Sequence, residues 1–394
     1  MDEAAQRCKV NPMHPLLSAG FRPFFLAAAA WSAISLAVWL SLLTGSFDLP
    51  SRFDPLTWHI HEMLFGFVMA AVGGFLLTAI PNWTNRAPVA GTPLVVLVTL
   101  WFLGRLACLG SALIPGWLAL VVDLAFAAGL ETIAARELIA VGNKRNYPLL
   151  APVVVLAIAN LLMHLQVLGV AIPIGLGWRL GIAAVIILIS VISGRIVPAF
   201  TRNWLTARGS SQTPPPVGML DRIALGTLHA GMMVWAFVPN WQPVGALLLA
   251  ASVLNLIRLA RWHGIGTFSE PLLLILHVGY LWLVIGVALL GASLLDASVP
   301  AAAAIHALTA GAMGTMILAV MTRATLGHTG RALHADTATI TLYALVSLAA
   351  VLRIVAAWTV DAQADVLEVS ALAWVGAFAL FLAQYGPMLL APRA

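Results

Sequence analysis

The sequence predicts an all-α integral membrane protein with twelve transmembrane helices, arranged as three parallel four-helix repeats with both termini in the cytoplasm. Composition, the number of apolar segments and the spacing of repeated motifs lead to this prediction. Hydrophobic residues make up 61% of the 394 residues and charged residues only 9%, whereas a soluble domain carries about 25% charged residues. The chain therefore belongs in a lipid bilayer.

The apolar segments set the number of helices, because one span needs roughly 20 apolar residues. Their apolar character is continuous and does not alternate, which excludes a transmembrane β-barrel. The longest polar connection, about residues 206–217, is too short to be a domain, so residues 1–394 form one polytopic membrane domain. The predicted spans lie at about 21–44, 57–80, 93–110, 116–136, 148–168, 178–199, 220–238, 243–260, 270–291, 301–322, 336–358 and 368–389.

Basic residues give the orientation, since cytoplasmic loops carry an excess of Lys and Arg. The opposite face clearly carries only Arg52 and Arg179, together with acidic residues such as Asp48, Asp54, Asp296, Asp361 and Asp365. The face with the termini is therefore predicted to be cytoplasmic. It carries Arg7, Lys9, Arg86, Arg136, Lys144, Arg145, Arg202, Arg208, Arg222, Arg258, Arg261, Arg323, Arg331 and Arg393.

Motif spacing indicates an internal repeat. A residue followed by proline opens an apolar segment at positions 22–23, and again 125 and then a further 123 residues later. The pair Asn82 and Trp83 recurs after 121 residues. Four helices in each unit give all units the same orientation, whereas inverted repeats are a common mark of transporters. The predicted units lie at about 20–140, 146–263 and 269–390.

Charge and cysteine content exclude several classes of partner. The net charge is +5, but the basic residues stand singly at the ends of spans, so no nucleic-acid partner is expected. Only Cys8 and Cys108 are present. Their separation makes a disulfide framework or a thiolate cluster unexpected, and any haem would be held by coordination alone.

Histidines within the spans are the strongest sign of chemistry. A single one is most simply a structural histidine bonded to a carbonyl. Several together are harder to explain by packing, because imidazole is a preferred ligand of haem iron, copper and zinc. Four of them fall in one depth band near the non-cytoplasmic ends of their helices. The six candidate ligands are His59, His61, His164, His229, His277 and His306.

Helical geometry separates the first two histidines. His59 and His61 are two residues apart, about 200° around a regular helix, so they cannot face one pocket. His59 and Glu62 share a face with small residues and are predicted to be the inward pair. His61 then serves either a second metal site or the membrane interface. Glu62 either supplies protons and fixes an imidazole, or is a first-turn acid stabilised by the helix dipole.

Two arginines near the non-cytoplasmic ends of their helices need anionic partners. Arg105 and Arg353 could each bind the propionates of a haem. For Arg105, pairing with Asp123 on the next helix is an equal alternative. Asp123 and Glu131, eight residues apart, could form a proton path or could be structural partners.

Motifs across nearly the whole chain resemble the NnrS family. The motifs are GFRPFF (20–25), WHIHEMLFGF (58–67), GFLLTA (74–79), NWT (82–84), LHVGY (276–280), and the run from His306 to MTRATLGHTGR (321–331). The resemblance implies a bacterial inner-membrane protein that contains haem and copper and is associated with denitrification and resistance to nitric oxide. The residues that it implies are His59, His61, Glu62, His277, Tyr280, His306 and His328.

The residues and the resemblance together predict a haem protein that handles nitric oxide and could reduce it, with Glu62 and Tyr280 as catalytic candidates. Two of His59, His306, His229 and His277 would ligate haem b, and His61 or His164 would belong to a copper or second-metal site. Electrons would come from a quinol or a partner protein, because flavin and iron–sulfur motifs are lacking. The alternatives are a transporter of a metal, haem or small anion, and a nitric-oxide sensor or sink without turnover.

Overall fold

The computed structural model describes residues 14–359 and 362–394, and within these ranges the chain is helical and contains no strand. Arg7, Cys8, Lys9 and Asp361 lie outside the described residues. The described part contains eleven helical segments that are long and apolar enough to cross a membrane. The chain is therefore a multi-pass α-helical membrane protein. These segments are Phe21–Leu43, Pro55–Thr84, Thr92–Leu109, Gly116–Ala140, Tyr147–Val167, Leu176–Ala207, Gln242–Ala260, Pro271–Leu295, Ala301–His328, Thr337–Val355 and Gln363–Leu390.

The remaining predicted span, at residues 220–238, is also a helix, α8 (Met219–Phe237). It carries Asp221, Arg222 and His229 within 19 residues. It is not among the eleven segments that are long and apolar enough to cross a membrane. The exact count of twelve spans, the three repeats and the cytoplasmic position of the termini stay predictions.

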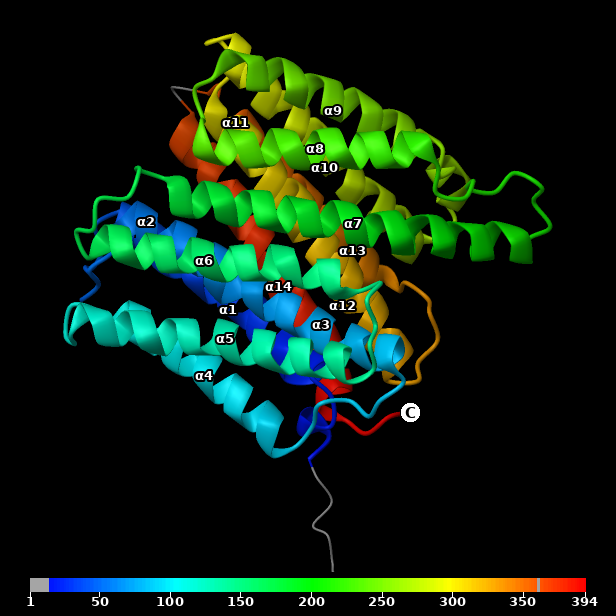
Figure 1. Cartoon of the computed structure of the whole chain (residues 1–394), viewed down its shortest axis with the longest axis horizontal. Helices are drawn as coiled ribbons and strands as arrows, with labels where there is room; N and C mark the ends of the chain where they lie inside the picture. Colours follow the sequence, from blue (N-terminus) through cyan, green and yellow to red (C-terminus); the bar gives the residue numbers. More distant parts are fainter. Residues whose placement is uncertain (1–13, 360–361) are drawn as a thin grey trace, which may run out of the picture.

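Consecutive helices pack side by side and lie roughly parallel to one another (Figure 1). The pairs α4 (Thr92–Leu109) with α5 (Gly116–Ala140), and α13 (Thr337–Val355) with α14 (Gln363–Leu390), are examples. The last helix also packs against α1 (Phe21–Leu43). There Arg22 donates hydrogen bonds to two carbonyls at the C-terminal end of α14, those of Leu389 and Ala391, at 2.8 and 2.6 Å. The two ends of the described chain thus close one bundle.

Three segments form the centre of this bundle. In the apolar stretches of Pro55–Thr84, Leu176–Ala207 and Ala301–His328, 78%, 78% and 67% of the residues are buried, against 28–39% in most of the other spans. Each central segment is the second helix of a predicted unit. Because they face protein on most sides, they can carry polar side chains that would be costly against lipid.

Two of the central segments change from α-helix to π-helix just after a histidine. His61 ends α2 (Pro55–His61), and the π-helix η2 (Glu62–Val68) leads into α3 (Met69–Thr84). His306 ends α11 (Ala301–His306), and the π-helix η5 (Ala307–Gly314) leads into α12 (Thr315–His328). π-Helices are rare and are found frequently at functional sites.

The start of α2 is fixed by local chemistry. The carboxylate of Asp54 accepts hydrogen bonds from the backbone N–H groups of Leu56 and Thr57, both at 3.1 Å, and Pro55 occupies the first helical position. Such a cap satisfies donors that the helix leaves free, and proline is favoured at this position. It places His59 and His61 in the first two turns, at one end of a central helix.

Candidate functional site

A cavity of about 410 Å³ lies between α1, α2 with η2, α7 (Leu176–Ala207), α11 with η5, α13 and α14. We call it the histidine cavity. Its walls are mostly apolar, with side chains such as Leu36, Phe67, Met313 and Trp374. The side chains that bring polar groups to it include His59, His306, Thr309, Arg353 and Ser370. A mostly apolar pocket with a few convergent polar groups is the usual form of a small-molecule or cofactor site.

The two histidines of the cavity each have a ring nitrogen available for a ligand. The His59 ring stacks on Trp39, with centroids 4.3 Å apart and planes 25° apart, and its buried Nδ1 has no hydrogen-bond partner among the described residues. The Nδ1 of His306 is 2.7 Å from the carbonyl oxygen of Ala302. A carbonyl can only accept, so Nδ1 carries the proton and Nε2 keeps its lone pair. This is the usual arrangement of a metal-binding histidine.

Arg353 brings a positive charge to the same cavity. It forms no ion pair with an acidic side chain in the part of the chain that the structure describes. A guanidinium group matches carboxylate geometry well. An anionic group on a bound molecule would therefore find a partner at this wall.

A second site lies on the other side of α2, where charged and polar side chains are packed together. We call it the histidine–carboxylate cluster, and all its members are buried. They come from α2, η2, α4, α5 and α6 (Leu150–Val167). The members are His61, Glu62, Arg105, Cys108, Asp123, Asn160 and His164.

Arg105 joins the two carboxylates of the cluster. One of its terminal nitrogens is 2.7 Å from Oε2 of Glu62, and the other is bonded to Oδ1 of Asp123. Glu62 also accepts from the indole N–H of Trp31 at 2.7 Å, and its Oε1 is 3.0 Å from Nδ1 of His61. Both oxygens of Glu62 are thus held, and Glu62 does not line the cavity.

Asp123 and His61 meet at the centre of the cluster. Oδ2 of Asp123 accepts from the amide of Asn160 at 2.8 Å, and it lies 3.0 Å from Nε2 of His164 and 3.2 Å from Nε2 of His61. The same Nε2 of His61 is 2.8 Å from Oδ1 of Asn160. A neutral imidazole has one N–H, yet both ring nitrogens of His61 face oxygen acceptors.

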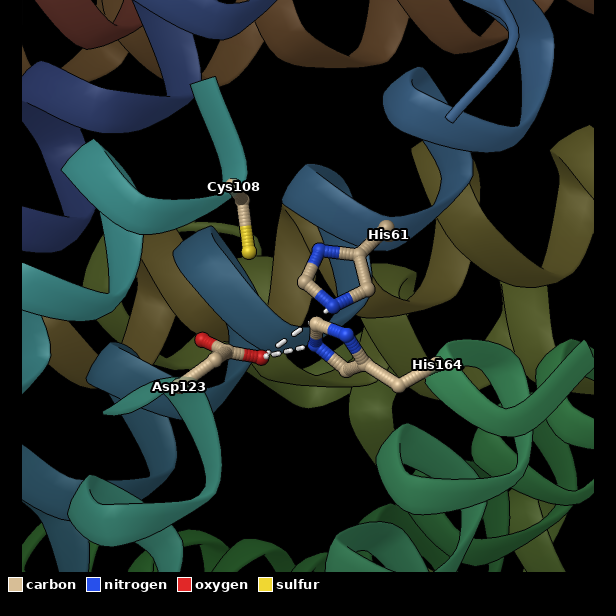
Figure 2. A group of neighbouring side chains, drawn as sticks. All are labelled: His61, Cys108, Asp123 and His164. Atoms are coloured by element: carbon tan, nitrogen blue, oxygen red, sulfur yellow. Dashed lines mark hydrogen bonds and ion pairs between the residues drawn. The ribbon is translucent and has the colours of Figure 1, made fainter. Parts of the chain in front are cut away.

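The cluster is therefore short of positive charge. Two carboxylates face one guanidinium, and buried charge without a partner is costly. A second proton on His61 or a metal ion would supply the missing positive charge. One donor atom from each of His61, Cys108, Asp123 and His164 lies within 4.8 Å of the others, so this group could hold a metal ion. Figure 2 shows the four side chains directed toward one common space.

The structure corrects the predicted pairing of His59 with Glu62. It places His59 in the cavity, while His61 contacts Glu62. Glu62 lies between the two histidines on the helix circumference, about 60° from one and 100° from the other, and its carboxylate turns to the side that carries Arg105. The prediction that His59 and His61 serve different sites agrees with this geometry.

The other predicted residues divide between the two sites and the rest of the bundle. His306 and Arg353 line the cavity with His59, whereas His164 lies in the cluster with His61. Arg105 pairs with Asp123, the alternative to a haem propionate, and it does not line the cavity. Glu131 is not a member of either site; one of its carboxylate oxygens is buried without a hydrogen-bond partner in the described chain.

The remaining candidates lie outside both sites. His229 is hydrogen-bonded to Ser190 at 2.8 Å and His277 to Thr201 at 2.9 Å. The Tyr280 hydroxyl accepts from Arg258 at 2.7 Å and donates to Asn255 at 2.6 Å. The His328 ring packs against Phe21. Tyr280 and His277 are thus well ordered in the second half of the bundle, but away from the cavity and the cluster.

Two members of the cluster, Cys108 and Asn160, were not predicted. Asn160 lies four residues before His164, on the same face of α6. Cys108 has no histidine on its own helix, because the four metal-binding candidates come from four different helices. A polar amide within an apolar span, one helical turn before His164, was the available signal for Asn160. For Cys108 the sequence offered none.

Comparison with known families gives one match. A protein-family model described as NnrS protein matches residues 15–393, which is nearly the whole chain, and this confirms the resemblance found in the motifs. No curated protein matches the chain.

Proposed function

Because this chain belongs to the NnrS family, we propose that it is a haem-containing protein of a bacterial inner membrane that handles nitric oxide. Its role would be in nitrosative-stress defence or denitrification. The observation that carries this proposal is the histidine cavity, where His59 and His306 bring free ring nitrogens into about 410 Å³ of mostly apolar space.

The residues of the cavity fit haem b. His59 and His306 would be the residues that hold the haem, one oriented by its stack on Trp39 and the other by its bond to Ala302. Arg353 would pair with the propionates. The mostly apolar walls would suit a porphyrin. When bound, haem would supply an iron that takes up nitric oxide and, given electrons, can support its reduction.

The chain's own residues would control access and charge. Nitric oxide is small and neutral, so it can reach the cavity through the bilayer without a polar path. Among the described residues, Arg353 is the only charged side chain that lines the cavity, so protons for a reduction would have to enter from elsewhere. The electrons would come from a quinol or a partner protein. Copper, the second metal that the family implies, has a suitable donor set in the histidine–carboxylate cluster.

The first test is the haem content of the detergent-purified protein and of single variants. We expect a Soret band in the wild type and its loss or a large shift in His59→Ala and His306→Ala. His229→Ala and His277→Ala are matched controls, because these imidazoles lie in the same bundle outside the cavity. Unchanged spectra in both cavity variants would contradict the assignment of the ligands.

The second test separates turnover from binding. Purified protein would be given nitric oxide anaerobically with an excess of a quinol. Continuous consumption is expected from a nitric-oxide reductase, and uptake of about one equivalent from a sensor or sink. A protein with neither a Soret band nor bound copper would remove both the reductase and the sensor or sink, and would leave the transporter hypothesis to be tested.

A further inference from the structure

We infer that His61, Cys108 and His164, with Asp123 as a fourth donor, form a closed copper site that is separate from the histidine cavity. The inference rests on the part of the proposed function that gives this protein copper, and it does not depend on whether haem is bound. Two imidazoles and one thiolate are the donor set of copper sites that carry electrons, in which a fourth ligand binds more weakly. This set is assembled here from four helices.

The distances in the cluster agree with a single ion. Copper and zinc bind nitrogen, oxygen and sulfur at about 2.0–2.3 Å, so two donors of one ion are at most about 4.6 Å apart. The four donor atoms lie within 4.8 Å of one another. Movements of a few tenths of an ångström would bring all four into contact with the metal.

The neighbouring side chains orient the ligands. Glu62 holds Nδ1 of His61 at 3.0 Å and so directs Nε2 toward Asp123 and His164. Asn160 holds Asp123 through its amide. Carboxylates and amides in these positions fix the tautomer and direction of ligand side chains. The rings of Phe53 and Phe65 cover the two histidines, with centroids 4.8 to 5.2 Å apart.

Charge also favours a divalent ion. With the thiol of Cys108 deprotonated by the metal, three negative groups face the single positive charge of Arg105, and a divalent ion makes the cluster neutral. It would also interact with Nε2 of His61, which lies near oxygen atoms of Asn160 and Asp123. Without a metal, a proton on each ring nitrogen of His61 would balance the second carboxylate, and the metal would take the place of one of these protons.

Burial indicates that the site is closed to substrates. The four donor residues are 0 to 3% exposed, and they do not line the histidine cavity. Closed metal sites keep all positions for protein ligands, whereas catalytic sites leave one open. The cluster would therefore hold its metal without presenting it to nitric oxide.

The test uses the full-length protein purified in detergent, loaded with copper and oxidised. We expect about one copper per chain in the cluster, a visible thiolate-to-copper absorption band and a matching Cu(II) electron paramagnetic resonance signal. Cys108→Ser should abolish the band, and His164→Gln should lower copper retention at least tenfold. His229→Gln is the matched control, and the helical circular dichroism of each variant checks that the bundle is folded.

Copper–sulfur scattering in the X-ray absorption of the wild type provides a measurement that needs no variant. Its absence, a band retained in Cys108→Ser, or a cluster that takes up zinc but no copper would overturn the inference. A protein with this copper signal but no Soret band would leave the inference standing and remove the haem proposal. The two failures can therefore be told apart.

Discussion

The histidine cavity and the histidine–carboxylate cluster lie on opposite sides of the same helix, and they differ in almost every physical property. The cavity has about 410 Å³ of space and mostly apolar walls, and it is lined by the guanidinium of Arg353, which has no acidic partner in the part of the chain that the structure describes. The cluster is filled by side chains, and nearly every nitrogen and oxygen in it has a partner. His59 faces the first and His61 the second.

This difference teaches how one short segment can serve two sites without mixing them. Space and free ring nitrogens suit a large ligand that must be approached by a substrate. Dense packing and fixed charges suit a small ion held by the protein alone. The two sites should therefore respond to different substitutions, and each of the following predictions tests that independence.

The largest effect is expected from Arg105→Met. This change removes the guanidinium that joins Glu62 to Asp123 and leaves both buried carboxylates without this partner. Breaking a buried ion pair in this way costs about 3–5 kcal/mol. We expect a strongly lowered Tm, or loss of folded protein, in thermal unfolding followed by tryptophan fluorescence.

Arg353→Met is the control for that experiment. Arg353 lines the cavity and has no acidic partner within the described ranges, so its removal should change the Tm little in protein without haem. If both substitutions lowered the Tm equally, the ion pairs of Arg105 would not be a special source of stability.

An intermediate effect is expected from filling the cavity with Ala310→Phe. Ala310 lines the cavity, so a ring at this position would compete with a large planar ligand. We expect most of the haem to be lost while the metal content of the cluster stays at the wild-type level. Overpacking itself costs typically 1–3 kcal/mol, so the haem and metal contents are measured on folded, monodisperse protein.

Ala344→Phe provides the matched substitution on the exposed face of α13, where the same ring meets no cavity. Haem should be retained there. If Ala310→Phe kept its haem, or lost haem and cluster metal together, the two sites would not be independent.

The smallest effect is expected from Asn160→Ala. Asn160 contacts both His61 and Asp123, but it is not among the four metal-binding candidates. Loss of a residue that orients ligands typically weakens metal affinity about 10–100-fold. Competition with a chelator should detect this change, and the Soret band should be unaffected.

Asn255→Ala is the comparison for Asn160→Ala, because Asn255 is an equally buried amide that bonds Tyr280 and backbone carbonyls elsewhere in the bundle. It should cost stability without changing the metal affinity. The same affinity in both variants would remove Asn160 from the environment of the metal.

Much of the architecture could be predicted from the sequence because apolar runs report directly on transmembrane helices. The predicted span at 57–80 and the helical segment Pro55–Thr84 illustrate this. Helical geometry also separated His59 from His61, since residues two positions apart point in opposite directions on any helix near 3.6 residues per turn.

The pairing within each site was less predictable. The direction of the Glu62 carboxylate depends on Arg105, which is 43 residues away in the chain. From its position on the helix alone, the carboxylate could turn either toward His59 or toward His61. Cys108 and His164 come together only through the packing of α4, α5 and α6 around α2. Counting cysteines tests for thiolate clusters, but it cannot detect a site that needs one cysteine and three other donors.

The π-helices η2 and η5 have a consequence for how this chain can change over evolution. His61 and His306, which precede them, are 245 residues apart, close to twice the spacing of the repeated motifs. A π-helix fits one extra residue into a helical turn, and deleting it would rotate everything on the N-terminal side by about 100°. One deletion in Glu62–Val68 would thus turn His59 and His61 away from both sites together, whereas substitutions could alter either site alone. We therefore expect natural variation in this family to proceed by exchange of residues here, with the length of the segment kept constant.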